Sequence, residues 1–133
     1  MKYLLLLHGT EGESQVNLSP EEMAANMEPW SRYTNELVRS GAFAGGEALH
    51  PSSASTTVRH QAGGDRIVSD GPFAETKEQI GGFYLLECTD LDEALEWARQ
   101  APVGEGSAVE IRPVVDLSEF GYEDPNAAAR AAG

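Results

Sequence analysis

Two short, strongly apolar runs constrain the fold of this chain most. Residues 2–8 read KYLLLLH, and residues 81–88 read GGFYLLEC. Apolar runs of about four to eight residues that end at polar or turn residues are typical of β-strands covered on both faces. The chain therefore has to supply a covering layer for each side of a sheet.

Two amphipathic helices are predicted, and each begins at capping residues. The first starts at Ser19-Pro20-Glu21-Glu22, a capping box with proline in the first turn, and its apolar spacing continues until Gly41 ends it. Pro29 lies inside this pattern and predicts a kink or a split. A single kinked helix is favoured because the apolar face stays in phase across Pro29. The second helix starts at Thr89-Asp90 and ends before Pro102.

Four further strands complete the predicted order β-α-β-β-β-β-α-β. They are expected at 42–50 with a glycine bulge, at 56–60, at 66–69 and at 108–115. A glycine-rich turn at 62–65 joins the second and third of these into a hairpin. Without this hairpin the chain contains two successive β-α-β units. The pattern therefore predicts an α+β, ferredoxin-like split βαβ sheet with an inserted hairpin.

Two helices cover only one face of such a sheet, although its central strands are apolar on both. Tyr84 and Leu86 alternate with Phe83 and Leu85, so apolar side chains point to each face. The second face then needs another cover. A homodimer packed sheet to sheet is the predicted solution.

The acidic composition limits the partners. Nine basic side chains against 22 acidic ones give a net charge of −13. Such a surface repels polyanions, so direct nucleic-acid binding and binding to an anionic membrane are disfavoured. Solubility is the simpler explanation of the charge, and a basic protein partner is the alternative.

The length and the remaining composition fit a small cytoplasmic protein. The 133 residues fit one domain, with the globular part expected at 1–115 and a surface arm with a frayed, alanine-rich end at 116–133. No apolar run approaches the roughly 20 residues of a membrane span, and no signal-peptide cleavage pattern occurs. The single cysteine, Cys88, cannot form an internal disulfide, which agrees with a cytoplasmic location.

The stretch 70–97, DGPFAETKEQIGGFYLLECTDLDEALEW, resembles the YCII-related family, in the branch named after its DGPF signature. MKYLLLLHG and RPVVDLSEF resemble the opening strand and the close of that family. The resemblance implies a dimeric α/β-barrel of ferredoxin-like halves, and it suggests a regulatory link to extracytoplasmic-function sigma factors. Some members are proposed to be enzymes with a His-Asp pair in a cleft. The corresponding region here holds Trp30 and Arg39, so that pair cannot be carried over.

Asp70 and His8 are the candidate catalytic residues. Asp70 opens the Asp-Gly-Pro-Phe corner, where its carboxylate either accepts main-chain N–H groups or faces a cleft and moves a proton. His8 ends the first strand, either as a hydrogen-bonded cap or as an acid or base near neutral pH. Glu110 is expected to face solvent, or to pair with Arg59 or Arg112 if it points inward.

Tyr84, Glu75 and Phe73 are the candidate ligand-binding residues. Tyr84 is expected to line a cleft, and Phe73 is able to fold back as a core anchor. Glu75, followed by Lys77, lies within reach of the Asp70 corner, with a solvated loop as the simpler alternative.

No cofactor or metal is expected. His8, His50 and Asp70 have no recurring metal-ligand spacing, and no phosphate-binding glycine motif follows a strand. The predicted function is small-molecule binding in a cleft between helix and sheet, with acid–base chemistry if the protein is an enzyme. The alternative is a non-catalytic interaction or regulatory module linked to an extracytoplasmic-function sigma factor.

Overall fold

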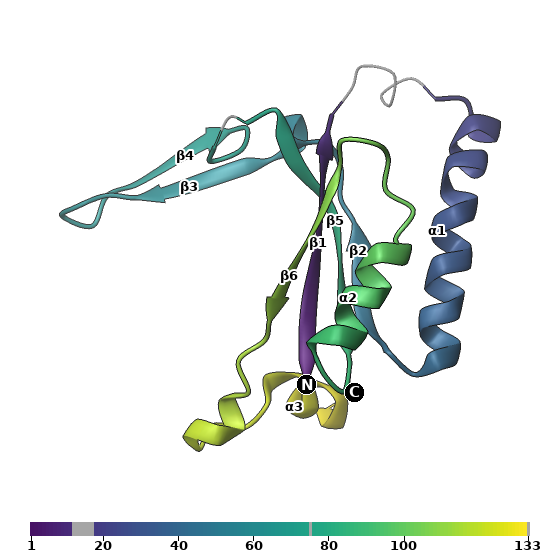
Figure 1. Cartoon of the computed structure of the whole chain (residues 1–133). Coiled ribbons are helices and arrows are strands. Elements are labelled where there is room, and N and C mark those ends of the chain that lie inside the picture. Colours follow the sequence, from purple (N-terminus) through teal and green to yellow (C-terminus); the bar gives the residue numbers. More distant parts are fainter. Residues whose placement is uncertain (12–17, 75, 133) are drawn as a thin grey trace.

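The predicted sheet, hairpin and helices all form. The computed structural model describes residues 1–11, 18–74 and 76–132 (Figure 1). The main elements are β1 (Lys2–Thr10), α1 (Pro20–Ser40), β2 (Phe43–Ala48), β3 (Thr56–His60), β4 (Arg66–Asp70), β5 (Glu78–Glu87), α2 (Leu91–Gln100), β6 (Ala108–Pro113) and α3 (Pro125–Ala132). Two short 3-10 turns, η2 (Ser52–Ala54) and η3 (Leu117–Phe120), lie in the connections.

Four strands form one antiparallel sheet in the order β2-β5-β1-β6. Strand β5 lies between β1 and β2, which are therefore parallel to each other and are connected through α1. Strand β1 likewise lies between β5 and β6, which are connected through α2. Each β-α-β unit is thus split by a strand of the other unit, and the predicted split arrangement is confirmed.

Helix α1 keeps its predicted caps and continues through Pro29. The Ser19 hydroxyl accepts the main-chain N–H of Glu22 at 3.1 Å. Gly41 ends the helix in the left-handed conformation, with φ of 83°, which glycine adopts without a Cβ penalty. Of the two predicted outcomes at Pro29, a single helix is confirmed and a split is wrong.

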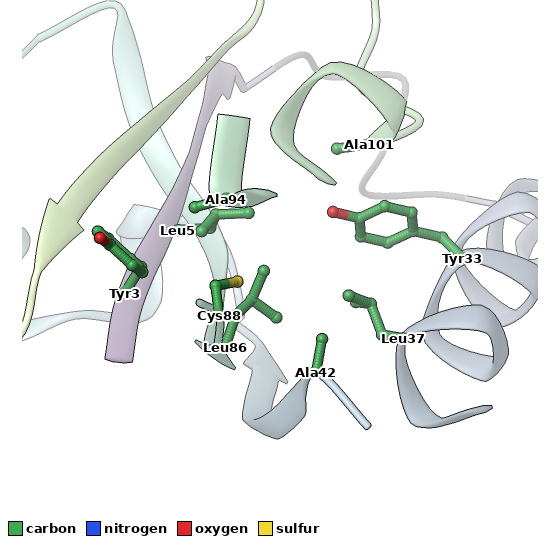
Figure 2. Packing of buried hydrophobic residues seen from close by; sticks show 9 residues of the cluster. All are labelled: Tyr3, Leu5, Tyr33, Leu37, Ala42, Leu86, Cys88, Ala94 and Ala101. Carbon is green, nitrogen blue, oxygen red and sulfur yellow. The ribbon is translucent and has the colours of Figure 1, made fainter. Parts of the chain in front are cut away.

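The core lies between the sheet and helices α1 and α2 (Figure 2). Tyr3 and Leu5 of β1 are buried there with Leu86 of β5 and with Cys88, which follows that strand. Because side chains alternate along a strand, Leu4 of β1 points to the other face. The remaining buried side chains are Tyr33, Leu37, Ala42, Ala94 and Ala101.

The other face of the sheet, called the open face below, is apolar at its centre. Leu4 pairs with Leu85, and Leu6 pairs with Phe83, in the register of β1 and β5. These four side chains are only partly buried. Figure 1 shows α1 and α2 on the opposite side of the sheet, so the helices that bury the core leave these side chains to solvent.

Strand β5 begins at Glu78, three residues before the strand predicted at residues 81–88. Residues 78–80 pair with 8–10 of β1, and Gly81 is skipped in the register, where Leu7 pairs with Gly82 and His8 with Ile80. This β-bulge at glycine separates the polar start of β5 from its apolar part. The predicted glycine irregularity in β2 is also present, as a register shift between Phe43 and Gly45.

Strands β3 and β4 form a separate two-stranded sheet. The turn between them contains Gly63 and Gly64, both with φ near 90°, so the predicted glycine turn is confirmed. In Figure 1 the hairpin projects from the four-stranded sheet, away from α1.

The C-terminal residues form more structure than predicted. Helix α3 begins at Pro125, and the Asp124 carboxylate accepts the main-chain N–H of Asn126 at 2.9 Å. Proline in the first turn and a run of alanines favour a helix. Residues 125–132 thus form a helix that the sequence analysis did not predict.

Candidate functional site

A hydrogen bond joins His8 to Glu110 on the open face. His8 lies in β1 opposite Ala108 of β6, and Leu6 lies opposite Glu110. His8 and Glu110 are therefore diagonal neighbours on one face of an antiparallel pair. The Nε2 atom of His8 is 2.9 Å from Oε1 of Glu110.

Arg112 holds the second oxygen of the same carboxylate. Its guanidinium is 2.7 Å from Oε2 of Glu110. The hydrogen bonds from Arg112 and then from His8 lower the pKa of Glu110. Glu110 faces solvent as expected, with 42% of its side chain exposed, and it is bonded on both oxygens. Of the two arginines considered for it, Arg112 is the partner.

The hydrogen bond to Glu110 selects one tautomer of the neutral His8 ring. An ionised carboxylate only accepts hydrogen bonds, so Nε2 of His8 carries the proton that it donates to Glu110. The basic nitrogen of the neutral ring is then Nδ1. A histidine oriented by a carboxylate in this way is suited to taking up a proton and to carrying it as the imidazolium ion.

A hollow of about 410 Å³ lies at the start of β5, the strand that pairs with β1 at His8. Its walls come from the β2–β3 connection, including Leu49, His50 and Ser52, and from Gln79 and Ile80 of β5. Ile80 is the cross-strand partner of His8, but His8 and Glu110 are not among the residues that line the hollow. Its volume falls within the roughly 300–1,000 Å³ of small-molecule sites.

Asp70 is the last residue of β4, paired with Thr56 and exposed. The Asp-Gly-Pro-Phe corner is held mainly by Gly71, whose N–H bonds the Ser55 carbonyl at 2.7 Å and whose carbonyl accepts the Thr57 hydroxyl at 2.7 Å. Within the described residues the Asp70 carboxylate accepts no hydrogen bond and forms no ion pair, so no such bond joins it to His8.

Phe73 is 72% exposed, so the expectation that it anchors the core is wrong. Its ring packs against the guanidinium of Arg59, with 5.1 Å between the guanidinium carbon and the ring centroid. Phe73 thus belongs to the hairpin surface. Glu75, the other candidate from this corner, lies outside the described residues.

Tyr84 faces the helices, on the side of the sheet opposite His8. Its hydroxyl lies 2.7 Å from the Thr34 hydroxyl. Its ring stacks on Trp30, with 6.3 Å between centroids, and meets the edge of Tyr33 at 5.4 Å. These rings fill the space between α1 and the sheet, so Tyr84 lines no part of the hollow beside His8.

Neither a metal-binding cluster nor a membrane-spanning helix occurs in the part of the chain that the structure describes. No group of three or more histidine, cysteine, aspartate or glutamate side chains is arranged to hold a metal ion in residues 1–11, 18–74 and 76–132. Within the same residues, no helix has the length and apolar character needed to cross a membrane.

The fold and the contacts define an α+β protein with a histidine–carboxylate pair on one face of its sheet. The chain belongs to the YCII-related family, because the sequence model of the YCII-related domain matches residues 1–118. It is also similar to an uncharacterised protein, R00369, of Rhizobium meliloti (strain 1021). The two are 40% identical over 116 residues, which cover 86% of this chain and 92% of that relative. The resemblance carried by the DGPF stretch is thereby confirmed.

Proposed function

We propose that this chain is a cytoplasmic, homodimeric YCII-related protein that binds a small molecule in the hollow beside His8. In this proposal His8 exchanges a proton with the bound molecule. The observation that carries the proposal is the 2.9 Å hydrogen bond between His8 and Glu110. It orients an imidazole whose cross-strand partner, Ile80, lines a hollow of ligand size.

The chemistry of the pair supports a role as a base. Arg112 keeps Glu110 ionised, and the ionised carboxylate stabilises the imidazolium that forms when His8 takes up a proton. Asp70 stays in the proposal as a second carboxylate for the ligand. The Asp70 carboxylate accepts no hydrogen bond within the described residues. Asp70 is also followed by Gly71, whose N–H bonds the carbonyl of Ser55, and Ser55 lines the hollow.

The apolar open face supports the proposed homodimer. Leu4, Leu6, Phe83 and Leu85 form a continuous patch across β1 and β5, and burying it against a second copy removes apolar area from water. Two ferredoxin-like halves would then form the dimeric α/β-barrel. Light scattering should give twice the chain mass for the wild type, and Leu6→Lys should shift the protein to monomer.

A thermal-shift screen against a library of small polar metabolites tests the binding site. A ligand at about 100 times its Kd adds about 2.7 kcal/mol to stability, which raises Tm by several degrees. Compounds that stabilise the wild type should lose this effect with His8→Gln and with Glu110→Gln. His60→Gln, which changes an exposed histidine at the end of β3, is the matched control and should keep it. Equal shifts in all four proteins would contradict the site.

A regulatory interaction module is the second candidate, and the net charge of −13 favours it. The partner would be a basic protein segment, such as one from an extracytoplasmic-function sigma factor. An electrostatic complex weakens as salt rises, because the Debye length falls from about 10 Å at 0.1 M to about 3 Å at 1 M. Co-purification at low salt and loss at high salt would support this role. Recovery without any protein partner, and with a bound metabolite, would favour the hollow.

A further inference from the structure

Two polar side chains in the wall of the hollow at the start of β5 already use their hydrogen-bond donors within the chain. Ser52 lies in the β2–β3 connection and Gln79 lies in β5, and both line the hollow. Each of them donates to a neighbouring part of the structure. The polar atoms that they have left therefore limit which chemical groups of a ligand they are able to bind.

Glu11 takes both donors of Ser52. One oxygen of the Glu11 carboxylate accepts the main-chain N–H of Ser52 at 2.7 Å, and the other accepts the Ser52 hydroxyl at 2.6 Å. A carboxylate accepts hydrogen bonds and donates none, so the hydroxyl proton of Ser52 points to Glu11. Ser52 then offers a ligand only the lone pairs of its Oγ atom, and it acts as an acceptor.

The side-chain amide of Gln79 is oriented in a similar way. Its Nε2 atom lies 3.0 Å from the Thr76 carbonyl oxygen, 3.2 Å from the Thr76 hydroxyl oxygen and 3.4 Å from the Ala74 carbonyl oxygen. These acceptors engage the two N–H groups of the amide and fix which way it is turned. Within the described residues Oε1 of Gln79 accepts no hydrogen bond, so Gln79 also offers the hollow an acceptor.

The charges around the hollow favour a cation. No lysine or arginine occurs among the described residues that line it, and Lys77, although close in sequence, is not one of them. The Glu11 carboxylate is bound to the wall at Ser52, and the whole chain has a net charge of −13. An anionic ligand would meet acceptors and negative charge here, whereas a cationic ligand is attracted.

The rest of the lining suits a short apolar group. Leu49 and Ile80 are 48% and 39% exposed, so contact with a ligand would remove apolar area from water. Pro51 lies between His50 and Ser52 in the same wall. His50 and the Ser55 hydroxyl are each able to donate or accept, and they discriminate little between ligands.

We infer that the hollow binds a small aliphatic amine in its ammonium form. The ammonium group donates to Oε1 of Gln79 and to Oγ of Ser52, and the carbon chain contacts Leu49 and Ile80. An ammonium group has three donors and no acceptor, which matches a wall that presents acceptors. This inference rests on the ligand-binding hollow of the proposed function and names the chemical class of the ligand.

Three probes with the same branched carbon skeleton test the class: isopentylamine, isopentanol and isovalerate. They are titrated into the full chain at pH 8 and constant ionic strength, where an alkylamine is protonated like a lysine side chain. Nitrogen-15 NMR follows the main-chain N–H groups of Leu49, Ser52 and Ile80. Isopentylamine should shift these signals with a Kd at least about fivefold lower than that of isovalerate, because only the amine is attracted by the nearby carboxylate.

Matched variants locate the amine. Gln79→Leu should raise the Kd of isopentylamine by about tenfold, because it removes a hydrogen bond to a charged group. Glu11→Gln should raise it several-fold by removing a charge without changing the size of the side chain. Glu21→Gln removes the same charge from the exposed first turn of α1, and it should leave this Kd unchanged. Lys77→Gln should not weaken the amine either. Thermal unfolding checks that each variant folds.

The outcomes separate the ligand class from the proposed function. If isovalerate binds as tightly as the amine or more tightly and shifts the same signals, the amine class is overturned and the ligand-binding hollow stands. If none of the three probes shifts these signals at millimolar concentration, the amine class is overturned, and the metabolite screen with His8→Gln still decides the proposed function. An amine Kd that is the same in Gln79→Leu, Glu11→Gln and the wild type also overturns the inference.

Discussion

The hydroxyl of Tyr33 donates a 2.7 Å hydrogen bond to the main-chain carbonyl of Trp97 and so joins α1 to α2. Trp97 lies in the last turn of α2, where carbonyls have no partner within the helix. The N–H of Ala101 bonds Ala98 instead. One tyrosine therefore satisfies a helix end and fixes the spacing of the two helices over the sheet.

Tyr33→Phe should lower the free energy of unfolding by about 1–2 kcal/mol, because it removes this bond and leaves a carbonyl unsatisfied. Urea denaturation measures the change. Tyr122→Phe is the control, since Tyr122 is exposed in the C-terminal arm, and its effect should stay within about 0.5 kcal/mol. Equal losses in both variants would contradict the role of the bond.

Gly46→Ala should destabilise the sheet, whereas Gly45→Ala should be tolerated. A Cβ at Gly46 would lie 2.8 Å from the Phe83 carbonyl oxygen and 3.1 Å from Cδ1 of Tyr84, whereas at Gly45 its nearest neighbour, Cβ of Leu85, is 3.9 Å away. Overpacking of this kind costs about 1–3 kcal/mol. Thermal unfolding of the two variants measures the difference. A similar Tm for both would show that β2 shifts freely against β5.

The Glu110 carboxylate should titrate below the usual range of a glutamate. Its pKa is lowered by hydrogen bonds from Arg112 and His8, so its stabilising effect is present above the ordinary pKa and is lost as pH falls through the lowered one. Carbon-13 NMR titration of this side chain should show the low pKa in the wild type. Arg112→Gln should move it back toward the ordinary value. An unchanged pKa in that variant would mean that Arg112 does not hold the carboxylate in solution.

Cys88 should make the protein less stable in alkaline solution. Burial, and then the negative charge of Glu93, raises the pKa of its thiol from 9.0 to about 11. A raised pKa means that the stabilisation is complete below pH 9 and is lost as pH rises toward about 11, because the unfolded chain releases the proton first. Urea denaturation at several pH values measures this slope. Cys88→Ala should show a shallower decline in that window, and an identical slope would count against the assignment.

Local sequence patterns were enough to predict most of the helices and strands. Capping residues and periodicity located α1 and α2, and alternation located the strands to within a few residues. The α3 helix was missed because its short, alanine-rich segment contains no large apolar side chain. The helix forms because Pro125 suits its first turn and the Asp124 carboxylate accepts the main-chain N–H of Asn126.

The candidate site was harder to predict, because it depends on strand register. His8 and Glu110 are separated by 102 positions in the chain, and only the pairing of β1 with β6 brings them together. The split arrangement predicted those strands as neighbours, but hydrophobic alternation did not set which residues are diagonal partners. Phe73 was misjudged for a related reason, since its apolar ring suggested the core while its corner lies at the base of the hairpin.

The β3–β4 hairpin is inserted between two strands that pair directly with each other. Strand β2 ends at Ala48 and β5 begins at Glu78, and their register does not involve the hairpin. Changing the length of such a connection alters closure entropy only slowly, by about 0.6 kcal/mol for each doubling. The arm is therefore free to lengthen, shorten or change sequence during evolution while the sheet and the His8–Glu110 pair stay in place.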